Sequence, residues 1–346
     1  MHICNDPDFN NLLSVLKREV PSRPTLFEFF LNGPLYAKLA GLAQEPAWGT
    51  IDGERALIQA FRNAGYDYVT LHASGMYFPT SAVNHMASRS MNDTAIIFDR
   101  KTYDAYQWPD PDSFDYSKLD TLTSELPEGM KIIVCGPGGV LENVMQITGY
   151  EGLCLMMVDD PGLVDKIFED VGSRLVRYYE ISSPRPTVGA VISNDDWGFN
   201  NQTMLSPADM RKYVFPWHER IVSVIHAAGK PAILHSCGNL EPVMDDIIDG
   251  MGYDGKHSYE DKIEPVEEAY ERYGKRIAIL GGLDLDFVCR STPDKITARA
   301  QAMLDRSASR GSYALGSGNS IPYYVPDENY LAMIEPAVAG RVGSDQ

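Results

Sequence analysis

PAILHSCGNLEPVMDD, residues 231–246, places a strand, a polar turn and the start of a helix in immediate succession. The apolar run 232–234 predicts a buried strand that ends in His235, Ser236, Cys237 and Gly238. Side chains two positions apart in an extended chain point to the same face, so His235 and Cys237 are presented together. Imidazole nitrogen and thiolate sulfur suit Zn²⁺. The alternative, that both residues are ordinary core residues, stays open at this point.

The same order of strand, polar turn and helix recurs along the chain, most regularly from residue 131 onward. Eight strands that alternate with helices are typical of a (β/α)₈ TIM barrel, and an open doubly wound sheet is the runner-up. The GPGG turn before the expected helix 138–149 lacks the G-x-G-x-x-G spacing of dinucleotide-binding sheets, which favours the barrel. The expected strands are 25–30, 66–73, 131–137, 188–197, 231–238, 253–258, 276–284 and 312–319.

The domain organisation follows from the same pattern. With 346 residues, of which 44% are hydrophobic, the chain can bury one large α/β core. We expect a helical lead-in over residues 1–24 and a single barrel domain over 25–346. A segment rich in Tyr, Asp and Pro, residues 76–115, is too long for a plain connection and is predicted to be a loop excursion that covers the substrate.

Composition excludes several classes of partner. The chain has 30 basic and 48 acidic residues, a formal charge of −18, which argues against general binding to nucleic acid or to an anionic membrane. Its apolar runs are of strand length, and its start lacks the pattern of a secretory leader, so we expect a cytoplasmic protein. The five cysteines, at positions 4, 135, 154, 237 and 289, are odd in number and scattered, which predicts reduced thiols.

Polar residues stand at the ends of the expected strands, where the loops of a barrel converge on one mouth. Asp195 and Asp196 are candidates for metal binding or proton transfer, but adjacent side chains on a strand point to opposite sides, so only one can face the mouth. Either could instead cap a helix. His72 and His257 are further catalytic candidates, with a hydrogen-bonded scaffold role as the alternative.

Other side chains are candidates for the substrate pocket and for the metal. Glu28 lies in an apolar strand, and Asn319 follows the last strand. Tyr77 in the loop excursion and Tyr323 after the last strand could wall a flat pocket, although surface packing explains such aromatic residues equally well. Cys289, just beyond the seventh strand, is either a second thiolate ligand or a small buried hydrophobic residue.

Five longer segments carry a resemblance: GGVLENVMQITGYEGL, NDDWGFNNQTMLSPADMRKYVFPWHERIV, HSCGNLEPVMDDIIDGMGYDG, GGLDLDFVCRSTPDKI and LGSGNSIPYYVPDENYLAMI. They resemble the uroporphyrinogen decarboxylase superfamily, nearest to its branch of zinc-dependent, corrinoid-linked methyltransferases. The resemblance implies a (β/α)₈ barrel in which His235 and Cys237 bind zinc. It also implies a third ligand, a cysteine in a glycine-rich turn after the last strand, but the turn here reads Gly316-Ser317-Gly318. Cys289, Glu28, Asp195 or Asp196 would then complete the site.

The activity that this resemblance implies is methyl transfer between a small methylated substrate, such as a methoxylated aromatic in an O-demethylase, and a corrinoid on a separate protein. The D-x-H-x-x-G pattern of a cobalt ligand is absent from this sequence, so we expect the corrinoid on a partner protein. We also expect a homodimer. The second hypothesis is a metal-free decarboxylase in which Asp195 or Asp196 stabilises a protonated intermediate. The arginine that binds substrate carboxylates in an N-terminal motif of that branch is missing here, because the segment reads FEFFLNGPLYAKLAG. Its absence counts against this hypothesis. The third is a non-enzymatic ligand-binding barrel.

Overall fold

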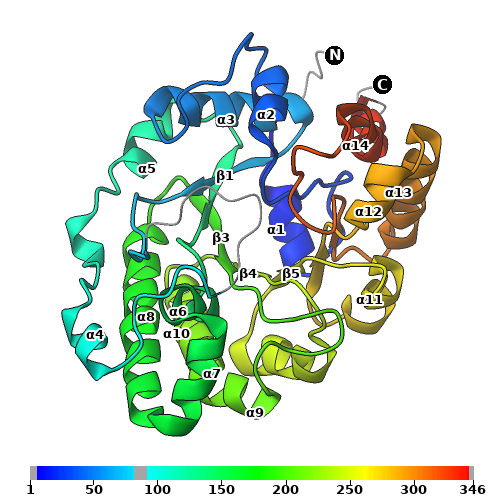
Figure 1. Ribbon diagram of the computed structural model, residues 1–346. Helices are drawn as coiled ribbons and strands as arrows, with labels where there is room; N and C mark the ends of the chain where they lie inside the picture. Colours follow the sequence, from blue (N-terminus) through cyan, green and yellow to red (C-terminus); the bar gives the residue numbers. More distant parts are fainter. Residues whose placement is uncertain (1–5, 82–91, 343–346) are drawn as a thin grey trace.

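The computed structural model describes residues 6–81 and 92–342, and it contains a parallel sheet of seven strands with helices arranged around it (Figure 1). The strands pair in sequential order, from β1 to β7, without the reversal that defines a doubly wound sheet. This α/β arrangement is that of a TIM-like barrel. The strands are β1 (Tyr68–His72), β2 (Lys131–Cys135), β3 (Val188–Asn194), β4 (Ala232–His235), β5 (Gly255–His257), β6 (Ala278–Leu280) and β7 (Tyr313–Ala314).

Three of the described helices begin or end at residues that local chemistry favours there. The Thr50 side chain accepts from the Gly53 amide at the start of α3, and Gly65 ends that helix with a left-handed φ of 93°. Pro161 opens α8, and Pro216 lies in the first turn of α10, after a π-helical turn. The α-helices are α1 (Asn10–Leu16), α2 (Gly33–Leu39), α3 (Ile51–Ala64), α4 (Arg100–Ala105), α5 (Lys118–Thr121), α6 (Val140–Thr148), α7 (Tyr150–Asp159), α8 (Pro161–Ser182), α9 (Pro207–Asp209), α10 (Phe215–Ala227), α11 (Val266–Tyr273), α12 (Leu285–Arg290), α13 (Pro293–Ser307) and α14 (Asp327–Val342).

Two of the helical segments take other forms. Residues Met210–Val214 and Asp246–Met251 are π-helical, and the second occupies the place of the expected helix after β4. Short 3₁₀ turns lie at Pro111–Ser113, Leu122–Ser124 and Glu241–Val243. Apart from 25–30, each expected strand is longer than the paired strand found there. At the ends of β3 and β4, the residues lost from the strand include Asp195, Asp196 and Cys237, which lie in the following loops.

The first expected strand, 25–30, is wrong as a regular strand. Among the described residues, this segment forms one isolated bridge, Leu26 with Leu315, and the next residue, Leu31, forms another with Ile321. Toward β1 no backbone ladder forms, because the phenolic oxygen of Tyr68 takes the place of a strand partner: it accepts from Glu28 N and donates to Glu28 O, both at 2.7 Å. The segment therefore lies between β7 and β1 without pairing regularly with either.

Helix α1 closes the amino-terminal end of the barrel. The ring of Phe9 lies so close to Gly189, near the start of β3, that a Cβ there would be 2.5 Å from it. Leu16 lies in the same way against Gly255, the first residue of β5. The helix found in the expected lead-in thus seals this end, which leaves the carboxyl ends of the strands as the open end.

The described residues of the loop excursion expected over 76–115 contain little regular structure. Its described part holds α4 and the turn Pro111–Ser113, and Tyr106 and Trp108 pack edge to face with ring centroids 4.6 Å apart. Residues 82–91 lie outside the described residues, as do residues 1–5 of the expected lead-in and 343–346 of the expected barrel domain. Of the five cysteines, the four described ones are free thiols, as expected.

Candidate functional site

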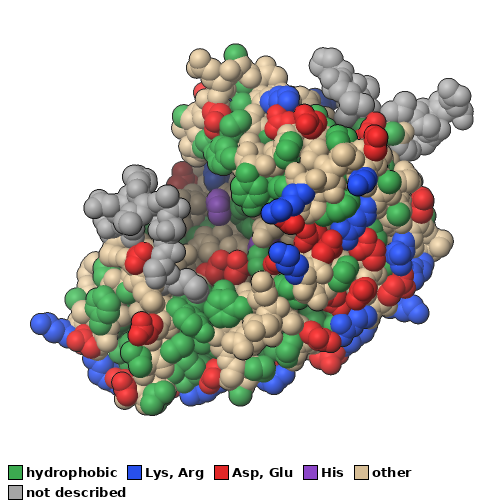
Figure 2. Space-filling view, turned by 45° about the vertical axis from the view of Figure 1, so that its right-hand side comes forward, with side chains coloured by type: hydrophobic (Ala, Val, Ile, Leu, Met, Phe, Trp, Pro, Cys, Tyr) green, Lys and Arg blue, Asp and Glu red, His purple; other side chains and the backbone are tan. Residues whose placement is uncertain are grey.

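The candidate site lies where β3, β4 and β5 end. The register pairs Asn194 with His235 and His235 with His257, so these three strands end at one level. Side chains that follow the strand ends therefore converge at the open end of the barrel. The face shown in Figure 2 is hollowed, and histidine and acidic side chains line the hollow.

Three potential metal ligands meet at this level. Ligand atoms of Asp196, His235 and Cys237 all lie within 4.8 Å of one another. The Nε2 atom of His235 is 3.9 Å from the Cys237 sulfur, and the backbone amide of Cys237 donates to Asp196 Oδ1 at 2.9 Å. A loop residue after β3 is thus held against the turn after β4. Imidazole, thiolate and carboxylate are the ligand types that zinc takes in proteins.

The orientation of His235 is fixed by a chain of acceptors. The ring of His257 lies next to it with the two Nδ1 atoms 2.7 Å apart, and His257 Nε2 lies 3.2 Å from the carbonyl oxygen of Ser317. A carbonyl only accepts, so His257 carries its proton on Nε2, and His235 must donate from its own Nδ1. The unprotonated Nε2 of His235 is then free to bind a metal ion. The Phe29 ring, with its centroid 4.6 Å away, packs against the imidazole.

Burial keeps these groups uncharged. Desolvation lowers the pKa of His257 to about 3, and it holds the pKa of His235 well below its usual value. Burial, with the Asp196 charge as a further cause, raises the pKa of the Cys237 thiol to about 12. A bound cation reverses that balance, because metal ligation stabilises a thiolate.

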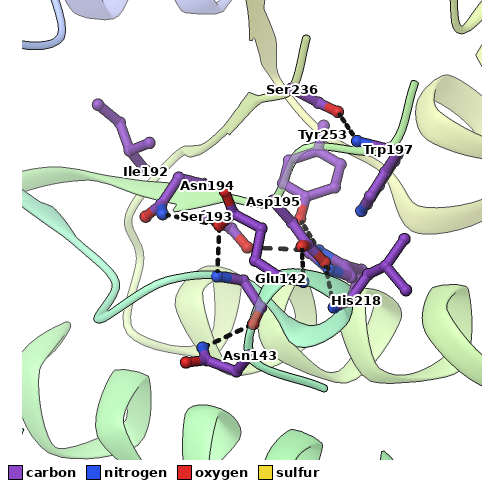
Figure 3. Close-up of polar contacts among 12 residues, drawn as sticks. Glu142, Asn143, Ile192, Ser193, Asn194, Asp195, Trp197, His218, Ser236 and Tyr253 are labelled. Atoms are coloured by element: carbon purple, nitrogen blue, oxygen red, sulfur yellow. Dashed lines mark hydrogen bonds and ion pairs between the residues drawn. The ribbon is translucent and has the colours of Figure 1, made fainter. Parts of the chain in front are cut away.

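Asp195 points toward the start of α6 and toward His218 (Figure 3). Its two carboxylate oxygens accept from the amides of Leu141 and Glu142, at 2.9 and 2.8 Å, at the start of α6. His218 Nε2 lies 2.9 Å from Oδ2, and Tyr253 Oη is 2.7 Å from His218 Nδ1. The side chain is fully buried. The neighbouring carboxylates therefore point to opposite sides: Asp195 caps a helix, and Asp196 lies with the potential metal ligands His235 and Cys237.

The remaining expected ligands lie outside this donor set. Cys289 is in α12, partly buried against the core, so Asp196 and not Cys289 accompanies His235 and Cys237. Glu28 is fully buried and accepts from Ser317 N at 2.5 Å, and its second carboxylate oxygen lies 2.9 Å from Ser317 Oγ. Burial raises the pKa of Glu28 to about 8. Glu28 and Ser317 are thus committed to each other.

A second feature near the open end is a cavity of about 780 Å³ beside β1. It lies on the side where the 25–31 segment fails to pair with β1, and both Tyr77 and Tyr323 line it. His72 also lines it, with its Nδ1 atom 3.4 Å from the Cys135 sulfur. Burial lowers the pKa of His72, so its ring is neutral. Asn319 instead lies at the metal donors, with Nδ2 3.3 Å from the Cys237 sulfur.

The sequence of this chain matches a known family over most of its length. The family model described as uroporphyrinogen decarboxylase (URO-D) matches residues 90–339. This chain belongs to the uroporphyrinogen decarboxylase family. The resemblance inferred from the sequence is thereby confirmed at the level of the superfamily, and the match spans every residue of the candidate metal site.

Curated members of the uroporphyrinogen decarboxylase family are distant relatives. The uroporphyrinogen decarboxylase of Geobacter sulfurreducens is 29% identical over 144 residues, which are 41% of this chain and 39% of that protein. The one of Streptomyces avermitilis is 26% identical over 236 residues, 66% of this chain and 62% of that protein. The chain thus spans less than two thirds of the length of either relative.

The fold of this family member also occurs in a solved methyltransferase. A methyltransferase from Methanosarcina mazei superposes with a TM-score of 0.69 at 16% identity, covering 94% of this chain and 97% of that one. At that identity the likeness shows a shared fold. Among the described residues, no helix has the length and apolar character needed to cross a membrane.

Two residues near the candidate site, Glu142 and His218, were not predicted from the sequence of this family member. Glu142 accepts from Gly139 N at 2.9 Å at the start of α6, and burial together with the charges of Asp195 and Asp196 raises its pKa to about 8. A glycine followed three residues later by glutamate is a helix-start signal that points to Glu142. His218 lies inside α10 at helical spacing from the buried Phe215 and Val222, a pattern that places it on the buried face of the helix but does not show its contact with Asp195.

Proposed function

We propose that this protein is a zinc-dependent methyltransferase that moves a methyl group between a small methylated substrate and a corrinoid carried by a separate protein. The observation that carries the proposal is the donor set Asp196, His235 and Cys237, with ligand atoms within 4.8 Å of one another at the open end of the barrel. Three protein ligands with a fourth position left for substrate are the pattern of catalytic zinc sites.

The residues fit such an ion chemically. His235 offers an unprotonated Nε2, because His257 and the Ser317 carbonyl oxygen occupy the other ring nitrogens of the pair. Asp196 Oδ1 is already oriented by the Cys237 amide at 2.9 Å. When bound, Zn²⁺ supplies Lewis-acid polarisation of the heteroatom that carries or receives the methyl group. The chain's own contribution is to fix the ligands before the ion arrives.

The cavity beside β1 supports a small aromatic or alkyl substrate. Its volume of about 780 Å³ is in the range of small-molecule sites. Phe30 lines it and connects it to the metal donors, because Phe30 packs on Phe29 with centroids 4.1 Å apart and Phe29 packs on His235 at 4.6 Å. Tyr77 and Tyr323 supply further ring surface, which suits a methoxylated aromatic.

A separate corrinoid protein is part of the proposal because the sequence lacks the D-x-H-x-x-G cobalt-ligand pattern. Its docking place would be the open end of the barrel, since the methyl group must reach both the substrate and the cobalt. The homodimer and the cytoplasmic location expected from the sequence stay predictions.

The test measures metal content and methyl transfer on the same preparation. Wild-type protein is expected to bind close to one zinc per chain, and His235→Ala and Cys237→Ala are expected to lose it. Methylated and methoxylated compounds are then screened with reduced cobalamin, and methylcobalamin formation is followed by its absorbance. A wild-type protein without stoichiometric zinc affinity contradicts the proposal. His226→Ala, which changes an exposed histidine paired with Asp254, is the control.

The second candidate function is decarboxylation without a metal, because the curated relatives carry the name uroporphyrinogen decarboxylase. Among the described residues that line the cavity, Lys118 is the one lysine or arginine, and it is paired with Glu54 at 2.9 Å. A substrate with many carboxylates needs more positive charge than that. Release of CO₂ from uroporphyrinogen by metal-free protein would decide in favour of the decarboxylase.

A further inference from the structure

Ser258, directly after β5, has a backbone conformation that serine rarely adopts. Its φ is 88°, beyond the usual left-handed range of about 50–70°. The other non-glycine residues with positive φ in the described chain, Arg18 and Ser312, both have a φ of 63° and lie within that range. Glycine is the residue that adopts such angles without steric cost. Serine at this position therefore indicates a role for the side-chain hydroxyl.

The Ser258 hydroxyl donates a hydrogen bond to the sulfur of Cys237 at 3.3 Å. A second donor reaches the same sulfur: Asn319 Nδ2, also at 3.3 Å. The orientation of the Asn319 amide is fixed, since its Oδ1 accepts from the Ser320 amide at 2.7 Å and Nδ2 must then face the sulfur. Two donors from separate loops thus converge on one metal-ligand atom.

A buried lysine holds the Ser258 turn in place. Lys256, 3% exposed, donates from Nζ to the carbonyl oxygen of Ser258 at 2.6 Å and lies 3.4 Å from that of Ser236. Its ammonium group also lies 4.2 Å from the centre of the Tyr259 ring. Because Ser236 is the residue between His235 and Cys237, this contact ties the turn after β4 to the turn after β5. The position of Ser258 relative to Cys237 is therefore set on both sides.

We propose that Ser258 is a positioning residue that, together with Asn319, orients the Cys237 sulfur toward the metal position and withdraws charge from it by hydrogen bonding. Backbone requirements explain the left-handed turn but not the choice of serine, because glycine would make the same turn. The inference rests on the proposed metal centre. It goes beyond it by assigning residues that bind no metal themselves and yet control one ligand.

The test separates the hydroxyl from the backbone. Ser258→Ala keeps Cβ and removes the hydroxyl, whereas Ser258→Gly removes both and relieves the strain. Both are expected to weaken zinc affinity about 10- to 100-fold in competition with a chelator. The melting temperatures of the metal-free proteins are expected to differ, with Ser258→Gly at or above wild type and Ser258→Ala at or below it. Zinc affinity should thus follow the hydroxyl, and stability should follow the backbone.

The matched control is Ser312→Gly, which relieves a positive φ at a buried serine whose hydroxyl donates to the Ile277 carbonyl oxygen at 3.3 Å. It is expected to leave zinc affinity unchanged. In the Co²⁺-substituted protein, the sulfur-to-cobalt charge-transfer band should move to longer wavelength in both Ser258 variants, because the sulfur loses a donor, and should not move in Ser312→Gly.

The outcomes distinguish the two proposals. If wild-type protein binds zinc and both Ser258 variants bind it equally well with an unshifted band, the role of Ser258 is wrong and the metal centre stands. If Ser258→Gly loses affinity while Ser258→Ala retains it, the backbone and not the hydroxyl is responsible, which also overturns the inference. If wild-type protein binds no zinc, the proposed function and the inference fail together.

Discussion

His257 lies behind His235 with the two Nδ1 atoms 2.7 Å apart, and this contact decides which nitrogen of His235 faces Cys237. The decision originates in a backbone carbonyl oxygen, that of Ser317, which accepts from the far side of the His257 ring. The turn after β7 that contains Ser317 therefore orients His235 through His257, although Ser317 itself is not one of the potential metal ligands.

Replacing His257 should weaken metal binding without removing a ligand. In His257→Phe the ring volume is kept, but the acceptor for His235 Nδ1 is lost, so the His235 ring is free to turn or to protonate the wrong nitrogen. We expect zinc affinity to fall by about 10- to 100-fold, measured by chelator competition. Unchanged affinity would show that packing against Phe29 alone orients His235.

The two adjacent aspartates should give opposite phenotypes. Asp195→Asn disturbs a fully buried carboxylate bonded to two amides and to His218, so we expect the free energy of unfolding to fall by about 3 kcal/mol while zinc still binds. Asp196→Asn should lose zinc with little effect on stability. Urea unfolding of the metal-free proteins and zinc titration separate the two effects. Zinc loss in Asp195→Asn without destabilisation would contradict the division of roles.

Glu28 predicts a pH dependence of stability. Its pKa in the folded protein is about 8, raised by burial from 4.5, so the folded state binds this proton more tightly than the unfolded state. Its contribution is therefore fully present below about pH 4.5 and is lost as the pH rises to about 8, by an amount on the order of a few kcal/mol. Glu28→Gln, which mimics the protonated acid, should flatten this dependence in urea unfolding measured from pH 5 to 8.

The contacts of the Ser317 hydroxyl also indicate that Glu28 is protonated. Ser317 Oγ contacts both Glu28 Oε2 and the carbonyl oxygen of Asn319, yet a hydroxyl has a single proton. With Glu28 protonated, the acid donates to Ser317 Oγ, and Ser317 Oγ donates to the Asn319 carbonyl oxygen. A Glu28→Gln protein with the same slope against pH as wild type would contradict this assignment.

Tyr68→Phe should destabilise the junction between the 25–31 segment and β1. The change removes the one group that satisfies both Glu28 N and Glu28 O on that side, and both are buried. Since an unsatisfied buried polar group costs about 1–3 kcal/mol, we expect a loss of about 2–4 kcal/mol in urea unfolding. Tyr324→Phe, at an exposed tyrosine, is the control and should change little.

Much of the architecture follows from local patterns. Alternating apolar strands and amphipathic helices predict the order and the parallel pairing of β1 to β7, because each strand needs a helix to cross back before the next begins. The short motif His235-Ser236-Cys237 already indicates an imidazole and a thiol close together, although only His235 belongs to β4 and Cys237 lies in the turn after it. The family was likewise recognisable from the sequence.

Contacts between residues far apart in the sequence determine the other features of the fold and of the candidate site. Which of Asp195 and Asp196 reaches the open end depends on where α6 begins, since the amides of Leu141 and Glu142 claim Asp195, 53 residues or more away in the chain. The failure of the 25–30 strand depends on a tyrosine hydroxyl 40 residues later. Only the tertiary structure brings Ser258 and Asn319 to the Cys237 sulfur and Lys256 to the backbone of Ser258. Such contacts join segments whose local patterns are independent, so no window of sequence contains the information that selects them.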